Sequence, residues 1–380
     1  MLQLLKPTKW LIVTFLLLSI FISTSPVFAQ TETYLETTEG IITKVISTGK
    51  ETFRNELAEY QELEITLTQE KNQGEIIIVK HFLIEGDASN PFGEEYQLND
   101  KVKLVINQSE TNEKIYTIDG KIKRDSLIAL GILFVVVVVV VGRIWGAFSL
   151  VGLSLSFLVI FKLIIPLIIR GTNPVLAAVL GAMLIVPITF YISHGFNTKT
   201  HIGVITTIVS LIFTGLLAVY FVEAAHLTGF ASEEAGFLQI ERSGTIDIRG
   251  LLLAGIIIGT LGILDDVTIG QSSTVQQLKK ANPKMKLLEL YTNGMKVGQD
   301  HISSMVNTLM LVYSGSALPL LLLFFGSQKS FLEILEYELI AEEIVRMLVG
   351  SIGLVLAAPL ATILAAYFFS ARKTLASPSL

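Results

Sequence analysis

The sequence predicts an α-helical polytopic membrane protein with about seven transmembrane helices and a small N-terminal β-barrel-like domain outside the cytoplasm. Of the 380 residues, 51% are hydrophobic and only 16% are charged, which is too apolar for an ordinary soluble domain. The apolar content is also uneven, because residues 30–125 read as a polar domain and most of the remainder consists of apolar runs. The polar part alternates apolar and polar residues, which indicates β-strands.

Composition excludes several classes of function. The net charge is −5, and acidic and basic residues are interspersed, so a nucleic-acid partner is not expected. The chain has no cysteine, which excludes disulfides, thiolate metal sites and cysteine nucleophiles. We find no H-E-x-x-H metal motif, no G-x-S-x-G elbow and no nucleotide-binding loop, so neither an enzyme nor a cofactor is expected.

Residues 1–29 have the pattern of a signal peptide. Lys6 and Lys9 precede an apolar stretch at 10–22, and small residues end at Ala29. We expect cleavage after Ala29, with an uncleaved anchor as the alternative. In either case residues 30–124 form the exported β domain, 125–370 the transmembrane domain and 371–380 a cytoplasmic tail.

Five short stretches of alternating hydrophobicity predict the strands of the outer domain. They lie at 41–46, 63–67, 76–79, 102–106 and 115–118. Five strands in some 85 residues fit a small, partly open barrel of the OB or SH3 kind, an architecture that assigns no function by itself. The domain has no cluster of aromatic residues for stacking bases, which argues against oligonucleotide binding.

The membrane domain follows from apolar segments that are long enough to cross a bilayer, which takes roughly 20 residues. The predicted spans are 126–142, 147–169, 174–192, 202–222, 251–273, 303–325 and 344–369. In the fifth and seventh of these, small residues at helical spacing predict close packing between helices. They are Gly255 and Gly259, and then Gly350, Gly353, Ala357 and Ala361.

Loop charges set the expected orientation, because lysine and arginine concentrate in cytoplasmic loops. With the β domain outside, the inner loops and the tail carry Arg143, Lys199, Lys279, Lys280, Lys284, Lys286, Lys296, Arg372 and Lys373. The outer loops are acidic and carry Glu233, Glu234, Glu241, Glu333, Glu336, Glu338, Glu342 and Glu343. The chain is therefore expected in the plasma membrane, with its C-terminus in the cytoplasm.

Several stretches of the membrane half resemble the YibE/F family of bacterial multi-pass membrane proteins. They are RGTNP at 170–174, GFNTKT at 195–200, GTLGILDDV at 259–267 and NTL at 307–309, followed by Gly315 and Pro319. The resemblance implies the architecture of a bacterial plasma-membrane protein and no established activity. Family members usually carry one acidic residue in the fifth helix, where this chain has Asp265 and Asp266, and the sequence leaves open which of the two corresponds.

The acidic pair Asp265–Asp266 is the sharpest candidate for a functional site. An aspartate within a spanning helix costs roughly 2.5 kcal/mol or more, so such residues usually face a polar interior. Adjacent residues differ by about 100° around a helix, so the two carboxylates cannot share one face. Thr268 and Ser272 lie on the stripe of Asp265. The alternative is a helix terminus at the membrane interface, where carboxylates are tolerated.

In the next predicted helix, Asn307 is the expected partner of this acidic pair, on a stripe with Ser303 and Ser314. A site for an ion or a proton between these two helices is one interpretation, and an ordinary interhelical hydrogen bond is the other. Glu223 and His226, three residues apart, are secondary candidates for a metal or a proton relay. A surface pair is the favoured interpretation, because no second motif of this kind exists in the sequence.

These features lead to a transporter or channel for a small ion as the first hypothesis of function. The alternative is a non-enzymatic sensor or assembly factor whose outer domain binds an extracytoplasmic or membrane protein partner. Its motivation is the short junction 122–125 between the outer domain and the first helix. The lipid bilayer is the one partner that both hypotheses require. The sequence indicates neither a substrate nor an oligomeric state.

Overall fold

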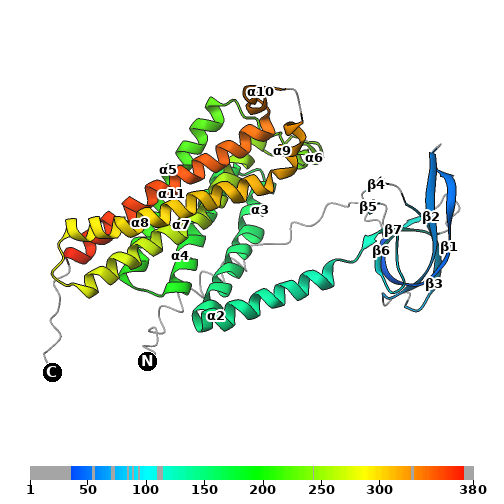
Figure 1. Ribbon diagram of the computed structural model, residues 1–380, viewed down its shortest axis with the longest axis horizontal. Coiled ribbons are helices and arrows are strands. Elements are labelled where there is room, and N and C mark those ends of the chain that lie inside the picture. Colours follow the sequence, from blue (N-terminus) through cyan, green and yellow to red (C-terminus); the bar gives the residue numbers. More distant parts are fainter. Residues whose placement is uncertain are drawn as a thin grey trace. The chain divides into compact units, whose positions relative to one another are not determined.

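A computed structural model describes residues 36–371, apart from 54–55, 70–72, 84, 88–89, 93–94, 109–113, 243 and 327–328. The predicted signal peptide or anchor 1–29 and all but the first residue of the predicted tail 371–380 lie outside the described residues. The described chain divides into two compact units, one ending at Val137 and one beginning at Val138 (Figure 1).

The first unit contains a five-stranded antiparallel sheet with the order β3-β2-β1-β6-β7. Its edge strands β3 and β7 contact each other, so the sheet is strongly curved. A separate two-stranded hairpin is formed by β4 and β5. The strands are β1 (Glu36–Phe53), β2 (Glu56–Leu67), β3 (Ile76–Leu83), β4 (Glu85–Asp87), β5 (Asn90–Phe92), β6 (Lys101–Gln108) and β7 (Lys114–Lys121).

All five strands predicted from alternation are confirmed, because the alternating residues bury one face of the sheet. In β3, Ile77 and Val79 are buried, whereas Ile76 and Ile78 are exposed. Side chains from the other long strands complete the core, among them Ile42, Leu63, Ile65, Leu67, Val102, Leu104 and Ile118. Strands β1 and β2 extend well beyond their predicted bounds as a paired ribbon.

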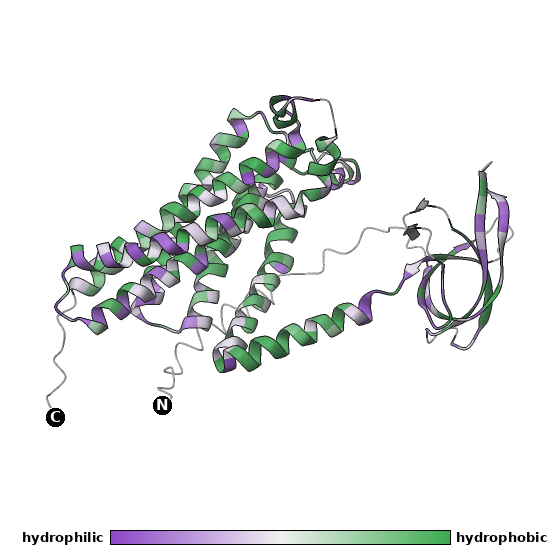
Figure 2. Cartoon of the chain, in the orientation of Figure 1, coloured by the Kyte–Doolittle hydropathy of each residue, from purple (hydrophilic) through white to green (hydrophobic). Residues whose placement is uncertain are grey.

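The helices follow the sheet and are mostly apolar (Figure 2). Among the residues that the structure describes, five helical segments are long and apolar enough to cross a membrane, and α8 and α9, bent by 67°, make a sixth if they form one span. The helices are α2 (Arg124–Val159), α3 (Ile165–Ile169), α4 (Pro174–His194), α5 (Thr198–Ala224), α6 (Glu233–Glu241), α7 (Ile248–Ala281), α8 (Leu287–Ser316), α9 (Leu318–Phe325), α10 (Phe331–Leu335) and α11 (Glu338–Ala371), with a π-helical turn η1 (Ile160–Ile164) between α2 and α3.

The helical stretch Arg124–Ile169 is interrupted at Arg143. It has 46 residues, and a straight helix of that length would measure about 69 Å, more than twice the roughly 30 Å of hydrocarbon in a bilayer. Arg143 has φ 51° and ψ −136°, which is not helical. A Cβ on Gly146 would lie 2.2 Å from the carbonyl oxygen of Val138, so glycine is required for the chain to fold this tightly. The break falls between the predicted spans 126–142 and 147–169.

In the second unit, α5, α7 and α11 pack against one another, α4 lies against α5 and α7, and α8 lies against α7 and α11 (Figure 1). The predicted small-residue stripe of α11 is confirmed, because Gly350, Gly353, Ala357 and Ala361 are all buried. Gly255 behaves differently, since a Cβ there would meet no atom within 4 Å in the described chain.

Helix α8 begins at Leu287, well before the predicted start at 303. Its first turns were not predicted because residues 287–302 are mixed polar and apolar, so their hydropathy is low although they form a helix. At the helix start, the Glu289 carboxylate accepts a hydrogen bond from the backbone N–H of Lys286 (2.9 Å), which is one half of a capping box.

Candidate intramembrane polar site

Asp265 and Asp266 lie in the interior of α7, which continues to Ala281, so neither marks a helix terminus. The two side chains have different surroundings. Asp265 borders the buried face of α7, and its Oδ1 atom is buried without a hydrogen-bond partner in the described part of the chain. Asp266, about 100° around the helix, is exposed. The structure therefore singles out Asp265 as the interior carboxylate.

Thr268 and Ser272 face α5, on the predicted stripe with Asp265. The hydroxyl groups of Thr268 and Thr207 are 2.6 Å apart, and Ser272 donates a hydrogen bond to the carbonyl oxygen of Lys199 at 2.9 Å. Thr207, Thr268 and Ser272 are all fully buried. The polar stripe of α7 is thus turned toward α5, a helix that the sequence did not identify as its partner.

The structure does not bring Asn307, Ser303 or Ser314 to the acidic pair. All three are exposed on α8. The face of α8 that packs against the bundle is apolar and consists of Ile302, Met305, Val306, Leu309 and Tyr313. Among the described residues, no hydrogen bond joins Asn307 to Asp265 or Asp266, because large apolar side chains occupy the face of α8 that packs on the bundle.

Further polar groups line the contacts among α5, α7 and α11. The hydroxyl of Thr362 donates to Oε1 of Gln271 at 3.0 Å, and both residues are buried. On α8, Gly298 makes room for this amide, because a Cβ there would lie 2.8 Å from Gln271 Nε2. The hydroxyl oxygens of Ser210 and Ser351 are buried and have no partner in the described chain. The three-helix contact region therefore retains unused hydrogen-bonding capacity.

Glu342 is a second interior carboxylate that the sequence placed in an acidic outer loop. Helix α11 begins at Glu338, which puts Glu342 in its first turns with only 7% of its surface exposed. Its Oε1 atom has no hydrogen-bond partner among the described residues. Glu338, by contrast, accepts hydrogen bonds from the hydroxyl of Thr228 (2.7 Å) and the N–H of Gly229 (3.0 Å). The hydropathy of the sequence could not distinguish Glu342 from Glu338, because the burial of Glu342 results from the packing of α11 in the tertiary structure.

Glu223 and His226 do not share a helix face. Helix α5 ends at Ala224, and His226 lies beyond it with φ 52°. Both residues are exposed. Among the residues that the structure describes, no group of three or more His, Cys, Asp and Glu side chains is arranged to hold a metal ion. The surface interpretation of this pair therefore fits the structure better than a relay.

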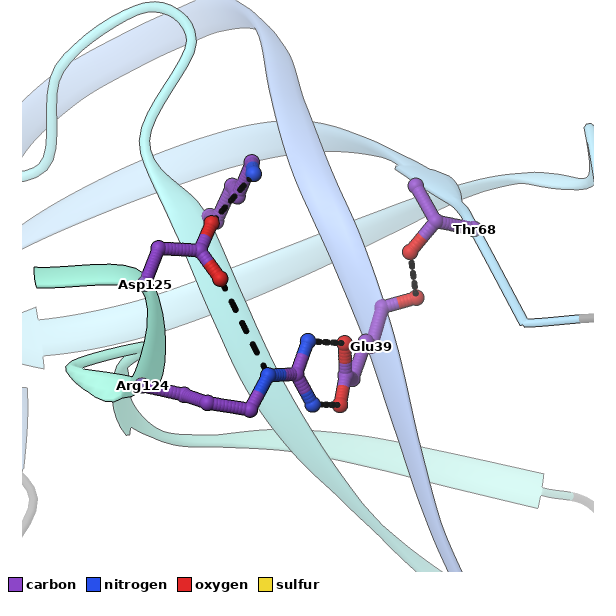
Figure 3. Close-up of polar contacts among 5 residues, drawn as sticks. Glu39, Thr68, Arg124 and Asp125 are labelled. Atoms are coloured by element: carbon purple, nitrogen blue, oxygen red, sulfur yellow. Dashed lines mark hydrogen bonds and ion pairs between the residues drawn. The ribbon is translucent and has the colours of Figure 1, made fainter. Parts of the chain in front are cut away.

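The junction between the sheet and α2 is held by two ion pairs within the first unit (Figure 3). The Arg124 guanidinium donates to both carboxylate oxygens of Glu39, at 2.9 and 3.2 Å. Asp125 accepts from Lys101 at 2.6 Å, and the Thr68 hydroxyl donates to the carbonyl oxygen of Glu39 at 3.1 Å. The first turn of α2 is thus fastened to strands β1 and β6.

A β unit followed by long apolar helices with a polar contact region defines a multi-pass membrane protein with an additional sheet domain. The model of the YibE/F-like protein family matches residues 130–371, and the chain belongs to this family. No curated protein and no solved structure matches the chain. The match covers the helices and leaves out the sheet, so the family is defined by its helical part.

Proposed function

We propose that the helical bundle is a transporter or channel for a small cation or for protons, with Asp265 as the group that binds the ion. The observation that carries the proposal is the buried, unpartnered Oδ1 atom of Asp265 beside the hydroxyl contacts of α5 and α7. A buried carboxylate oxygen without a partner is costly, and such groups persist mainly at functional sites.

The surroundings of Asp265 supply oxygen atoms of the kind that a desolvated cation or a proton needs. Thr268 lies one turn further along α7, and its hydroxyl contacts that of Thr207. Ser272, two turns along, is about 10 Å from the level of Asp265, since each residue adds about 1.5 Å. Hydroxyls and a carboxylate at successive levels form a ladder of oxygens along α5 and α7. An ion could exchange water for these oxygens as it moves.

For the arrangement in the membrane, we infer seven spans. Five long helices and the bent α8–α9 pair account for six, and division of the 46-residue helix at Arg143 adds one. An odd number of spans places the β unit and the C-terminus on opposite sides. The distribution of lysine and arginine puts the β unit outside the bacterial plasma membrane, as an OB- or SH3-like domain that follows a signal peptide.

The proposal is tested by flux in proteoliposomes under a proton gradient and under gradients of Na⁺ and K⁺. Asp265→Asn keeps the shape of the side chain and removes its charge, so flux is expected to fall to the level of empty liposomes. Asp266→Asn is the matched control, because it makes the same change at the adjacent, exposed position, and flux is expected to persist. Equal flux through the wild type and Asp265→Asn would refute the role of Asp265.

A sensor function is the second candidate, and the ion pairs at the junction favour it. Arg124 and Asp125 connect the first turn of α2 directly to the sheet, so a displacement of the sheet would reach this helix. Such exposed pairs are screened by water and contribute little to stability. Their main effect is to fix the orientation of the first turn of α2 relative to strands β1 and β6, and their contribution to the stability of the fold is small.

Arg124→Glu is expected to increase hydrogen exchange at residues 122–127, because it places two carboxylates face to face at Glu39. The exchanged pair Glu39→Arg with Arg124→Glu is expected to restore slow exchange. Hydrogen exchange monitored by mass spectrometry checks both variants in the full chain. If the single variant exchanges as slowly as the wild type, the junction is held by other contacts and the coupling argument fails.

A further inference from the structure

Helix α8 presents a polar face away from the bundle. The exposed residues on this face share helical spacing, and we call them the α8 stripe. They are Lys296, Asp300, Ser303, Ser304, Asn307 and Ser314. The opposite face of α8 carries the apolar residues that pack on the bundle. Leu311 is also exposed on this face, between Asn307 and Ser314, so the outward side of α8 is mixed polar and apolar, whereas a span surrounded by lipid is expected to be apolar there.

The outward faces of two other helices of the bundle are apolar and provide the contrast. On α5 and α11, the exposed large side chains include Ile205, Val209, Ile212, Phe213, Leu356 and Ile363. Lipid tails fit such residues, but they offer no hydrogen-bond partner to a hydroxyl or an amide. The α8 stripe is thus, together with the exposed Asp266 on α7, a part of the bundle surface that hydrocarbon accommodates poorly.

The described part of the chain provides no hydrogen-bond or ion-pair partner for the side chains of the stripe. Asn307 and Ser303 make no side-chain hydrogen bond among the described contacts, and Lys296 and Asp300 form no ion pair there. The part of α2 from Leu127 to Val141 carries apolar side chains, so it offers no side-chain hydrogen-bond partner to the Asn307 amide or to the serine hydroxyls of the stripe. The group that fits the stripe must carry donors, acceptors and both signs of charge.

We propose that the α8 stripe is the interface with a second copy of this chain, related by a two-fold axis parallel to α8. The stripe is self-complementary, as an isologous interface requires. Lys296 and Asp300 are one helical turn apart and opposite in charge, so each lysine reaches the aspartate of the second copy. The Asn307 amide both donates and accepts, so two copies can pair across the axis.

Small side chains on the stripe let the two helices approach closely. Ser303, Ser304 and Ser314 are small, and Gly315 beside them has no atom within 4 Å of the position that a Cβ would occupy. Small residues and interhelical hydrogen bonds are what hold helices together in lipid. The interface lies on the side of α8 remote from α7, so it is independent of the site at Asp265.

Disulfide cross-linking tests the proposal directly, because the chain contains no cysteine. Single variants Ser303→Cys, Asn307→Cys and Ser314→Cys are oxidised in native membranes and examined on non-reducing gels. A product of twice the chain mass is expected for each. Ile212→Cys on α5 and Ile363→Cys on α11 are matched controls, since both are exposed on apolar faces, and no such product is expected.

A second measurement uses the mass of the purified full chain in nanodiscs and does not depend on transport. A dimer is expected, and Asn307→Leu is expected to weaken it by roughly three- to tenfold in the dissociation constant. A monomeric mass without cross-linking above the controls would overturn the proposal. A cross-linked product with a different protein, in place of a dimer, would overturn it as well.

Discussion

Gly353→Ala is expected to destabilise the helical bundle by about 1–3 kcal/mol, the usual cost of overpacking a close contact. A Cβ at this position would lie 2.2 Å from Thr214 Oγ1 and 3.1 Å from its Cγ2. Thr214 is fully buried, and its hydroxyl donates to the carbonyl oxygen of Ser210 at 2.8 Å, so the side chain has no free direction in which to move. Helices α5 and α11 must then separate. The apparent melting temperature of the purified chain measures the loss.

Gly350→Ala is the matched control on the same helix. The nearest atom to a Cβ there is Thr260 Oγ1 at 3.7 Å, which is ordinary van der Waals contact. This variant is expected to melt at or slightly above the wild-type temperature, because alanine favours helix by up to about 1 kcal/mol over glycine. Combining Gly353→Ala with Thr214→Ala removes the obstructing atoms and is expected to recover part of the stability. A Gly353→Ala chain as stable as Gly350→Ala would contradict the close contact.

Asp265→Asn is expected to stabilise the chain while it abolishes flux. The Oδ1 atom of Asp265 is buried without a partner in the described chain, and a neutral amide costs less to bury there than a charged carboxylate, whereas removing a charge that holds the fold together would have the opposite sign. A gain in stability with a loss of function is the pattern of a residue kept for function. Thermal unfolding and flux are measured on the same preparation, so the two effects can be compared directly.

Asp266→Asn separates this effect from a general change in charge. The Asp266 side chain is exposed, so this variant is expected to change the free energy of unfolding by no more than about 0.5 kcal/mol and to melt close to the wild-type temperature. If Asp265→Asn lowers the melting temperature, the carboxylate stabilises the fold, and its burial needs no functional explanation. The two variants together therefore distinguish a site from a structural contact.

The membership of the chain in the YibE/F-like family concerns its helices, and the polar groups on α7 and α8 lie within the matched residues 130–371. Asp265, Thr268 and Ser272 on α7 and the α8 stripe all fall between residues 130 and 371. The sheet lies outside it. A function at Asp265 would accordingly be a property of the helical part, whereas a role of the ion pairs at the junction would depend on the sheet.

Local patterns in the sequence determined the elements. Alternation placed the five strands, because one face of a sheet is buried whichever other elements surround it. Glycine and alanine at helical spacing predicted the packed face of α11, and the spacing of Asp265, Thr268 and Ser272 placed them on one stripe of α7. Each of these results depends on the geometry of a single element.

Only the tertiary structure decided which polar residues face the interior. Asn307 and Thr268 are both polar residues in long apolar helices, yet one is exposed and the other is fully buried. Glu342 is buried although it belongs to an acidic run. Hydropathy assigns a polar residue the same value on either side of a helix, and the side is chosen by the large apolar residues that pack best. That choice turned α7 toward α5 and left the polar face of α8 outside.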